Sequence, residues 1–155
     1  MKKSVSLSLC LVALLLLLAG CGRKESRVLD FNGEKVKVTV KLSDGWEADW
    51  SETVCYLYPG KNDGTLRVAG WGICMSAEEF AEHSAKITGT HADKYKNVRI
   101  LKDGSIKCEY GSSGEEGASA YYYNKISDKS YMLIVSQKIP GDDLFSRFDV
   151  VLVKQ

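Results

Sequence analysis

The amino-acid sequence predicts an α+β domain, mainly an antiparallel sheet of about six or seven strands with two helices packed on it, preceded by a cleaved signal peptide. Three observations predict this class. Apolar and polar residues alternate over 36–42, as in a strand with one buried face. Ser76 and Glu79 have the spacing of a helix capping box. Asp103-Gly104 separates two short strand-like segments, which is typical of a hairpin, and sheets built from hairpins are antiparallel.

The first half of the folded region contains three predicted strands. Residues 36–42 place valine and leucine on one face and lysine or threonine on the other. Ser43-Asp44-Gly45 follows as a turn. Residues 53–58 and 65–74 predict a pair of strands, because residues 59–64 between them are rich in turn formers.

A helix and a hairpin follow. The helix begins at the Ser76 capping box, has a narrow apolar stripe and ends near Gly89. Residues 98–102 and 105–110 flank Asp103-Gly104 and form the predicted hairpin.

The last part of the chain predicts another antiparallel pair and a final helix. Residues 118–126 and 130–139 are the two strands of this pair. Asp142 or Asp143 can begin the final helix, which carries spaced apolar residues. Its ending, residues 150–153, is equally compatible with a strand.

Composition excludes several classes of function. Two of the 21 basic residues and none of the 20 acidic residues lie in positions 1–20, so the rest of the 155-residue chain is close to neutral. A nucleic-acid-binding module needs a clustered cationic surplus, so we expect no nucleic-acid partner. The apolar content argues against disorder, and the length suits one compact domain.

Residues 1–20 have the features of a secretory signal peptide. Lys2 and Lys3 form a positive head, and residues 9–19 form an unbroken apolar stretch. This stretch is too short to cross a bilayer as a helix, which needs about 20 residues. It ends in Leu18-Ala19-Gly20-Cys21, which resembles the lipobox of bacterial lipoproteins.

The lipobox resemblance implies a covalent membrane anchor. In that family the cysteine thiol receives a diacylglyceryl group, and a peptidase cuts just before the cysteine. For this chain, cleavage would follow Gly20, and Cys21 would be the lipidated N-terminus. Two acyl chains, such as palmitate, hold a protein stably in a membrane, whereas one binds marginally. We therefore expect the protein on the extracytoplasmic face of the cell membrane or outer envelope.

The residues after the anchor are interpreted as a linker and one domain. Residues 22–27 are polar and have no apolar side chain to pack, which predicts a lipidated tether over 21–27. Residues 28–155 contain no proline-rich linker and no internal repeat, so we expect a single α+β domain there.

The order of elements also resembles the PsbP-like fold. The resemblance rests on Leu42-Ser43-Asp44-Gly45-Trp46 near the start and on an aromatic meander before a final helix. It would cover most of residues 28–155. Members of that superfamily are extrinsic photosynthetic subunits and small bacterial envelope lipoproteins. The resemblance implies an accessory or binding role more than catalysis, although a fold alone does not determine function.

Three cysteines beyond Cys21 each fall in a predicted strand. They show no C-x-x-C spacing, and their number is odd. We interpret Cys55, Cys74 and Cys108 as buried thiols that pack like small apolar residues. One disulfide is the alternative, since exported domains often meet an oxidising compartment. In the predicted register Val68 lies near Cys55, so a bond from Cys55 to Cys74 would need a shifted register.

No pattern predicts a catalytic residue, a metal ligand or a cofactor. Glu79 and His83 lie four residues apart on the predicted helix, and Glu82 and His91 are near. Metal sites usually need three or four convergent donors, so a solvated helix face is the preferred interpretation. The sequence also lacks a G-x-S-x-G nucleophile elbow and any triad spacing.

Aromatic residues remain as candidates for a binding surface. Because side chains alternate along a strand, Tyr122 faces away from Tyr121 and Tyr123, and an aromatic ring must meet a helix or solvent. Exposed tyrosine and tryptophan suit contact with a protein or a glycan, and packing in the core is the alternative. The candidate surface residues are Trp46, Trp50, Trp71 and Tyr122.

These observations together predict a membrane-anchored lipoprotein with a non-enzymatic accessory or binding role in the cell envelope. Its partners would be the membrane, through the lipid on Cys21, and an envelope protein. The alternatives are a small-ligand carrier with aromatic residues lining a pocket, and an envelope enzyme whose catalytic residues are dispersed along the chain.

Overall fold

The computed structural model describes residues 22–60, 68–111, 119–137 and 143–153. These residues form ten strands in two sheets, one α-helix and three short segments of other helix types. The fold is therefore rich in antiparallel sheet and belongs to the α+β class, as predicted. The predicted signal peptide, residues 1–20, and Cys21 lie outside the described residues.

The smaller sheet has three strands in the order β1-β2-β10. Strands β1 (Arg23–Phe31) and β2 (Glu34–Leu42) form a hairpin, and β10 (Phe148–Leu152) pairs with the other edge of β2. The hairpin turn is Asn32-Gly33, and both residues have positive φ, 53° and 73°. Such a two-residue turn matches the twist of the strands that it joins.

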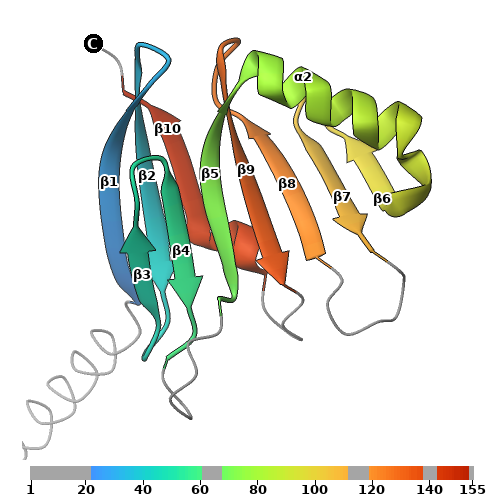
Figure 1. Ribbon diagram of the computed structural model, residues 1–155. Helices are drawn as coiled ribbons and strands as arrows, with labels where there is room; N and C mark the ends of the chain where they lie inside the picture. Colours follow the sequence, from blue (N-terminus) through green and yellow to red (C-terminus); the bar gives the residue numbers. More distant parts are fainter. Residues whose placement is uncertain (1–21, 61–67, 112–118, 138–142, 154–155) are drawn as a thin grey trace, which may run out of the picture.

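The larger sheet has seven strands in the order β3-β4-β5-β9-β8-β7-β6, and neighbouring strands are antiparallel. Its central strand pair, β5 and β9, runs through the middle of the molecule (Figure 1). The strands are β3 (Glu47–Trp50), β4 (Val54–Tyr58), β5 (Gly70–Ser76), β6 (Tyr95–Ile100), β7 (Ile106–Tyr110), β8 (Ser119–Lys125) and β9 (Ser130–Gln137).

Helix α2 (Ala77–Ala85) begins at the predicted capping box. The Ser76 hydroxyl accepts a hydrogen bond from the Glu79 backbone N–H at 3.1 Å, and Glu79 Oε2 accepts one from the Ser76 N–H at 2.7 Å. The helix continues into η1 (Lys86–Thr90) and η2 (Ala92–Lys94), which lead to β6.

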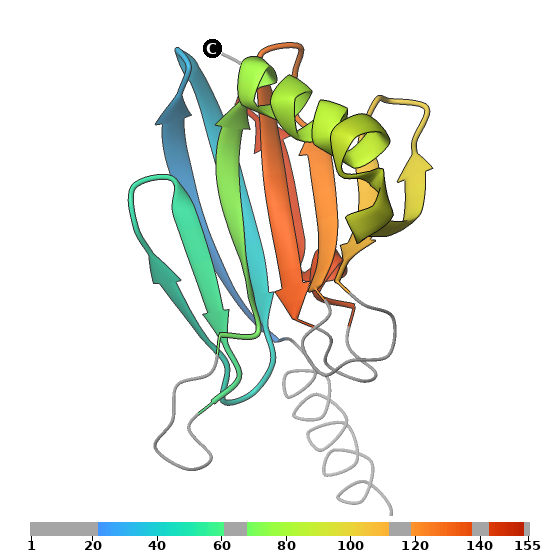
Figure 2. The ribbon, with the colours of Figure 1, turned by 45° about the vertical axis from the view of Figure 1, so that its right-hand side comes forward.

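The molecule has three layers: the small sheet, the large sheet and α2 on the far face of the large sheet (Figures 1 and 2). The first core fills the space between the sheets, and the second core lies between the large sheet and the helix. The first core comprises Leu29, Val36, Val38, Val40, Leu42, Cys55, Leu57, Ala69, Cys74, Met132, Ile134, Leu144 and Phe148. The second core comprises Met75, Ile87, Ile106, Cys108, Tyr123, Tyr131, Leu133 and Val135.

The predicted tether is corrected by the structure. Residues 23–27 belong to β1, where Arg23 lies opposite Leu42 and Arg27 opposite Val38. These polar residues join the sheet through backbone pairing with β2, which needs no apolar side chain. Gly22 is therefore the single described residue that precedes the strand.

The predicted final helix is also wrong, and its stated alternative is confirmed. Residues 144–147 form the 3₁₀ turn η3 (Leu144–Arg147), and the strand β10 follows. The apolar residues of this segment include Leu144 and Phe148, which are buried in the first core. The sequence prediction of six or seven strands also missed β3, so the described residues hold more strands and fewer α-helices than expected.

Candidate binding surface

Helix α2 crosses one face of the large sheet (Figure 2). Six aromatic side chains lie on this face, toward the strand ends away from Ser76, where α2 starts. Tyr110 is 39% exposed, and the other five are partly buried. We call this set the aromatic surface. Its members are Tyr56, Tyr58, Trp71, Tyr95, Tyr110 and Tyr121.

The strand register brings part of the aromatic surface into one row. Tyr56 of β4 lies opposite Trp71 of β5, Trp71 lies opposite Val135 of β9, and Val135 lies opposite Tyr121 of β8. Neighbouring strands are about 4.8 Å apart, so these side chains stand next to one another across four strands. Val135 is buried between the two flanking aromatic residues in this row.

The alternation of side chains explains why these residues share a face. In β4, Cys55 and Leu57 point into the first core, so Tyr56 and Tyr58 must point to the other face of the sheet. The same rule separates Tyr121 from Tyr122 in β8. The alternation of Cys55 and Leu57 with the tyrosines of β4 was the sequence signal that could have placed Tyr56 and Tyr58 on this face.

The rings of the aromatic surface contact one another at the β6 edge. The ring centroids of Tyr95 and Tyr110 are 5.2 Å apart, and those of Tyr110 and Tyr121 are 5.9 Å apart. Burial raises the pKa values of Tyr95 and Tyr121, so both hydroxyl groups stay protonated at neutral pH. The surface therefore offers ring faces and neutral hydroxyl groups, which suit stacking and hydrogen bonding.

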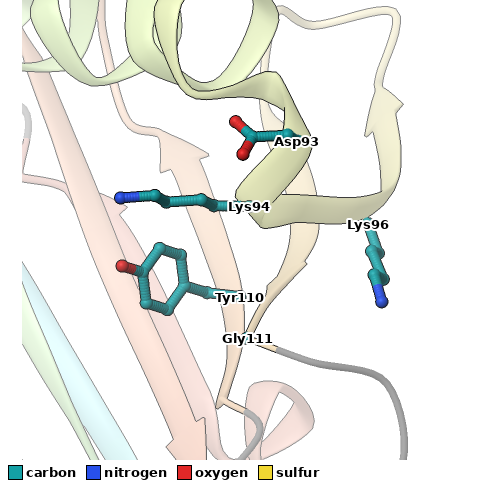
Figure 3. Close-up of a pocket in the computed structure, with 5 residues that line it drawn as sticks. All are labelled: Asp93, Lys94, Lys96, Tyr110 and Gly111. Atoms are coloured by element: carbon teal, nitrogen blue, oxygen red, sulfur yellow. The ribbon is translucent and has the colours of Figure 1, made fainter.

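A pocket of about 350 Å³ lies at this edge of the sheet (Figure 3). The side chains of Lys94 and Tyr110 extend toward the same side, whereas Lys96 points away from them. The volume is at the low end of the range for small-ligand sites. The lining residues are Asp93, Lys94, Lys96, Tyr110 and Gly111.

His83 and Glu79 of α2 have structural roles. His83 Nδ1 lies 3.2 Å from the Tyr123 hydroxyl, which joins the helix to the large sheet. Burial lowers the pKa of His83, so its imidazole is neutral at pH 7. The carboxylate of Glu79 binds the backbone at the helix start. Within residues 22–60, 68–111, 119–137 and 143–153, no three His, Cys, Asp or Glu residues gather as a metal site would require.

The four aromatic residues named from the sequence do not lie on one surface. Trp71 belongs to the aromatic surface and packs against the second core. Trp46, Trp50 and Tyr122 pack against the first core, on the opposite face of the large sheet. The Arg147 guanidinium lies 4.2 Å from the Trp46 ring centroid, and the Lys107 ammonium lies 4.4 Å from that of Tyr122.

The three described cysteines are free and buried, as predicted. Burial raises the pKa of Cys55 to about 12 and those of Cys74 and Cys108 to about 11. A reactive cysteine needs a lowered pKa and access to solvent, so these thiols are structural. The predicted register at Cys55 is wrong: Gly72 lies opposite it, because β5 begins at Gly70, later than expected.

Comparisons with known proteins give no match to a family model, a curated protein or a solved structure. In the described part of the chain, no helix is both long and apolar enough to cross a membrane. Gly20 and Cys21, the residues of the predicted cleavage and lipidation site, lie outside the described residues.

Proposed function

We propose that this chain is a bacterial lipoprotein, anchored through acyl groups on Cys21, whose folded domain binds a partner in the cell envelope and catalyses no reaction. The support for the anchor is in the sequence: a positive head, a short apolar stretch and all four lipobox positions occur in the right order. Two acyl chains make such an anchor effectively permanent.

The aromatic surface is the observation that carries the binding role. Tyrosine and tryptophan provide large rigid contact areas with polar ends, and they are enriched where proteins bind one another. In this chain they come from strands β4 to β8 and lie on the same face of the large sheet. The partner that this chemistry suits best is another envelope protein.

A small-ligand carrier is the second candidate, and the pocket beside Tyr110 favours it. This pocket combines one aromatic ring with the charged residues Asp93 and Lys94. A small anionic or zwitterionic ligand fits that combination. The likeness to the PsbP-like superfamily is compatible with either role, and it rests on residues 42–46 and on the order of the elements.

The anchor is tested by replacing cysteines in a bacterial host that is fed labelled palmitate. Cys21→Ala should abolish incorporation of the label and leave uncut precursor, because the acyl acceptor is lost. Cys10→Ala is the matched control, since it removes a cysteine of the apolar stretch and should label normally. Normal labelling of Cys21→Ala would refute the lipoprotein assignment.

The binding role is tested by photo-crosslinking in intact cells. A photoreactive phenylalanine is placed at Tyr56 or Tyr110 in the aromatic surface, or at Val151 as a control. Val151 is 47% exposed and lies on the small sheet, away from the aromatic surface. Both tyrosine positions should give an adduct with the same protein, and Val151 should give none. Equal adducts at all three positions, or none at the tyrosines, would contradict the proposal.

A further inference from the structure

Two lysines lie side by side at the end of the small sheet where β1 begins. Lys24 of β1 is directly opposite Lys41 of β2. Val40 and Leu42 point into the first core, so Lys41 and its partner Lys24 point outward, and both are exposed. Like charges directly opposite one another destabilise a sheet. The electrostatic repulsion between two such lysines is reduced when an anion binds between their ammonium groups.

The other positions on the same outer face do not repeat this arrangement. Lys35 lies opposite Asp30, and Lys37 lies opposite Val28. Between the pair Lys37–Val28 and the lysine pair, Ser26 lies opposite Thr39, and their hydroxyl groups share a hydrogen bond of 2.8 Å. The like-charge pair is thus confined to the end near Gly22.

An arginine bonded to the Lys41 backbone, and a tryptophan that packs on this arginine and on the first core, lie at the same end of the small sheet. Arg147 Nη1 donates a hydrogen bond to the Lys41 carbonyl oxygen at 3.2 Å, and its guanidinium stacks on Trp46. We call Lys24, Lys41, Arg147 and Trp46 the basic end cluster. Asp44 is an exposed carboxylate in the neighbouring turn. Among the residues that the structure describes, no ion pair joins Lys24 or Lys41 to a carboxylate.

The basic end cluster lies close to the proposed lipidation site. A Cβ atom on Gly22 would come within 2.8 Å of the Leu42 carbonyl oxygen, so Gly22 lies directly against the end of β2. Cys21 is two positions before Arg23, and the Cα atoms of residues two apart are at most about 7 Å apart. Acyl chains on Cys21 would therefore bring this end of the small sheet to the lipid headgroups.

We propose that the basic end cluster binds the phosphate groups of anionic phospholipids in the membrane that holds Cys21, with Lys24 and Lys41 making the contacts. This inference rests on the proposed function. A lysine ammonium is a compact charge that binds phosphate without a fixed geometry. Tryptophan is enriched at the headgroup level of membranes. The acyl chains and the lysines would then hold the domain at two points, which fixes its tilt on the membrane.

The test is amine footprinting of the mature, acylated protein in vesicles. One set of vesicles contains phosphatidylglycerol, the other contains phosphatidylcholine alone, and acetylation of each lysine is measured by mass spectrometry. Lys24 and Lys41 should react about fivefold more slowly in the anionic vesicles, the factor that corresponds to about 1 kcal/mol per lysine near such a surface. Salt at about 1 M should remove the difference, because it shortens the Debye length to about 3 Å.

Lys35 is the matched control on the same strand and face. It lies six residues from Lys41, about 20 Å along β2, and its reactivity should be the same in both vesicles. Equal reactivity of Lys24 and Lys41 in the two vesicles, with the acyl mass present on Cys21, would overturn this inference alone. Equal protection of Lys35 would also overturn it, because the contact would not be confined to the cluster. A protein without acyl mass would refute both the proposed function and this inference.

Discussion

Gly72 is a residue of β5 at which the two sheets approach each other closely. A Cβ atom at this position would come within 2.8 Å of Cε1 of Phe148, whose ring packs from β10 onto β5. A glycine inside a strand often weakens the strand or marks a bulge. The structure gives a different reason, since β5 is regular and Gly72 leaves room for the aromatic ring.

Gly72→Ala should therefore destabilise the protein by about 1–3 kcal/mol, the usual cost of overpacking a core. Urea unfolding followed by tryptophan fluorescence measures this change. Gly89→Ala is the matched control, because a Cβ atom there meets no atom within 4 Å, and it should change stability by less than about 1 kcal/mol. Equal stabilities of the two variants would contradict the packing argument.

Glu34 joins the two sheets through its carboxylate. Its Oε2 atom accepts hydrogen bonds from the hydroxyl groups of Ser130, the first residue of β9, at 2.6 Å and of Ser127, in the turn before β9, at 2.7 Å. The bond from Ser130, followed by that from Ser127, lowers the pKa of Glu34. A lowered pKa in the folded state means that ionised Glu34 adds stability above its unfolded pKa of about 4.3, and that this stability is lost as the pH falls further.

We predict that Glu34→Gln costs about 1 kcal/mol at pH 7, the size of a typical hydrogen-bond contribution. The difference from the original protein should shrink as the pH falls below about 4, where Glu34 itself becomes protonated. Urea unfolding at pH 7 and pH 3.5 measures it, with the exposed Glu52→Gln as the control. A difference that is independent of pH would show that the ionised carboxylate is not what joins the sheets.

At the scale of elements, α2 is the one that the sequence predicted best. Its capping box specifies the first turn locally, so the prediction needs no knowledge of the tertiary structure. The helix is held on the large sheet by the stacking of Phe80 on Tyr131, with ring centroids 3.9 Å apart, and by the contact of His83 with Tyr123.

Ser76→Ala should lower stability by about 1 kcal/mol, because it removes the acceptor for the Glu79 N–H. Ser84→Ala, in the body of the same helix, should have a smaller effect, since alanine is favoured there. Thermal unfolding by circular dichroism compares the two variants. If Ser84→Ala were the more destabilising change, the cap would not be what stabilises the helix.

The elements that the sequence missed depend on contacts between distant parts of the chain. Residues 23–27 show no alternation of apolar and polar side chains that would predict a strand. They form one because β2 supplies the backbone partner. The Asn32-Gly33 turn was the available local signal for this hairpin. β10 was predicted as a helix because its apolar spacing suits both structures, and pairing with β2 decides between them.

The aromatic surface could be predicted only in part, for a related reason. Trp71, one of the four candidates from the sequence, belongs to the aromatic surface, but its neighbours Tyr56 and Tyr121 come from other strands. Their adjacency follows from the register of four strands, which a single sequence does not specify. Alternation along a strand predicts which residues share a side of it. Alternation does not predict which of the two sides is covered by a second sheet.

For the whole molecule, the start of β1 sets the relation between the fold and the proposed anchor. With Gly22 as the single residue between Cys21 and the strand, the small sheet would begin at the membrane surface. The aromatic surface lies on the α2 face of the large sheet, away from the small sheet. The start of β5, which carries Trp71, and the start of β1 lie at the same end of the molecule (Figures 1 and 2). An envelope partner would therefore be bound close to the membrane.

The most direct test of this account is intact-mass analysis of the mature protein from the membranes of its bacterial host. We predict a polypeptide that begins at Cys21 and carries the mass of a diacylglyceryl group on that residue. A polypeptide that is free in the culture medium, begins at a different residue and has no acyl mass would contradict the account.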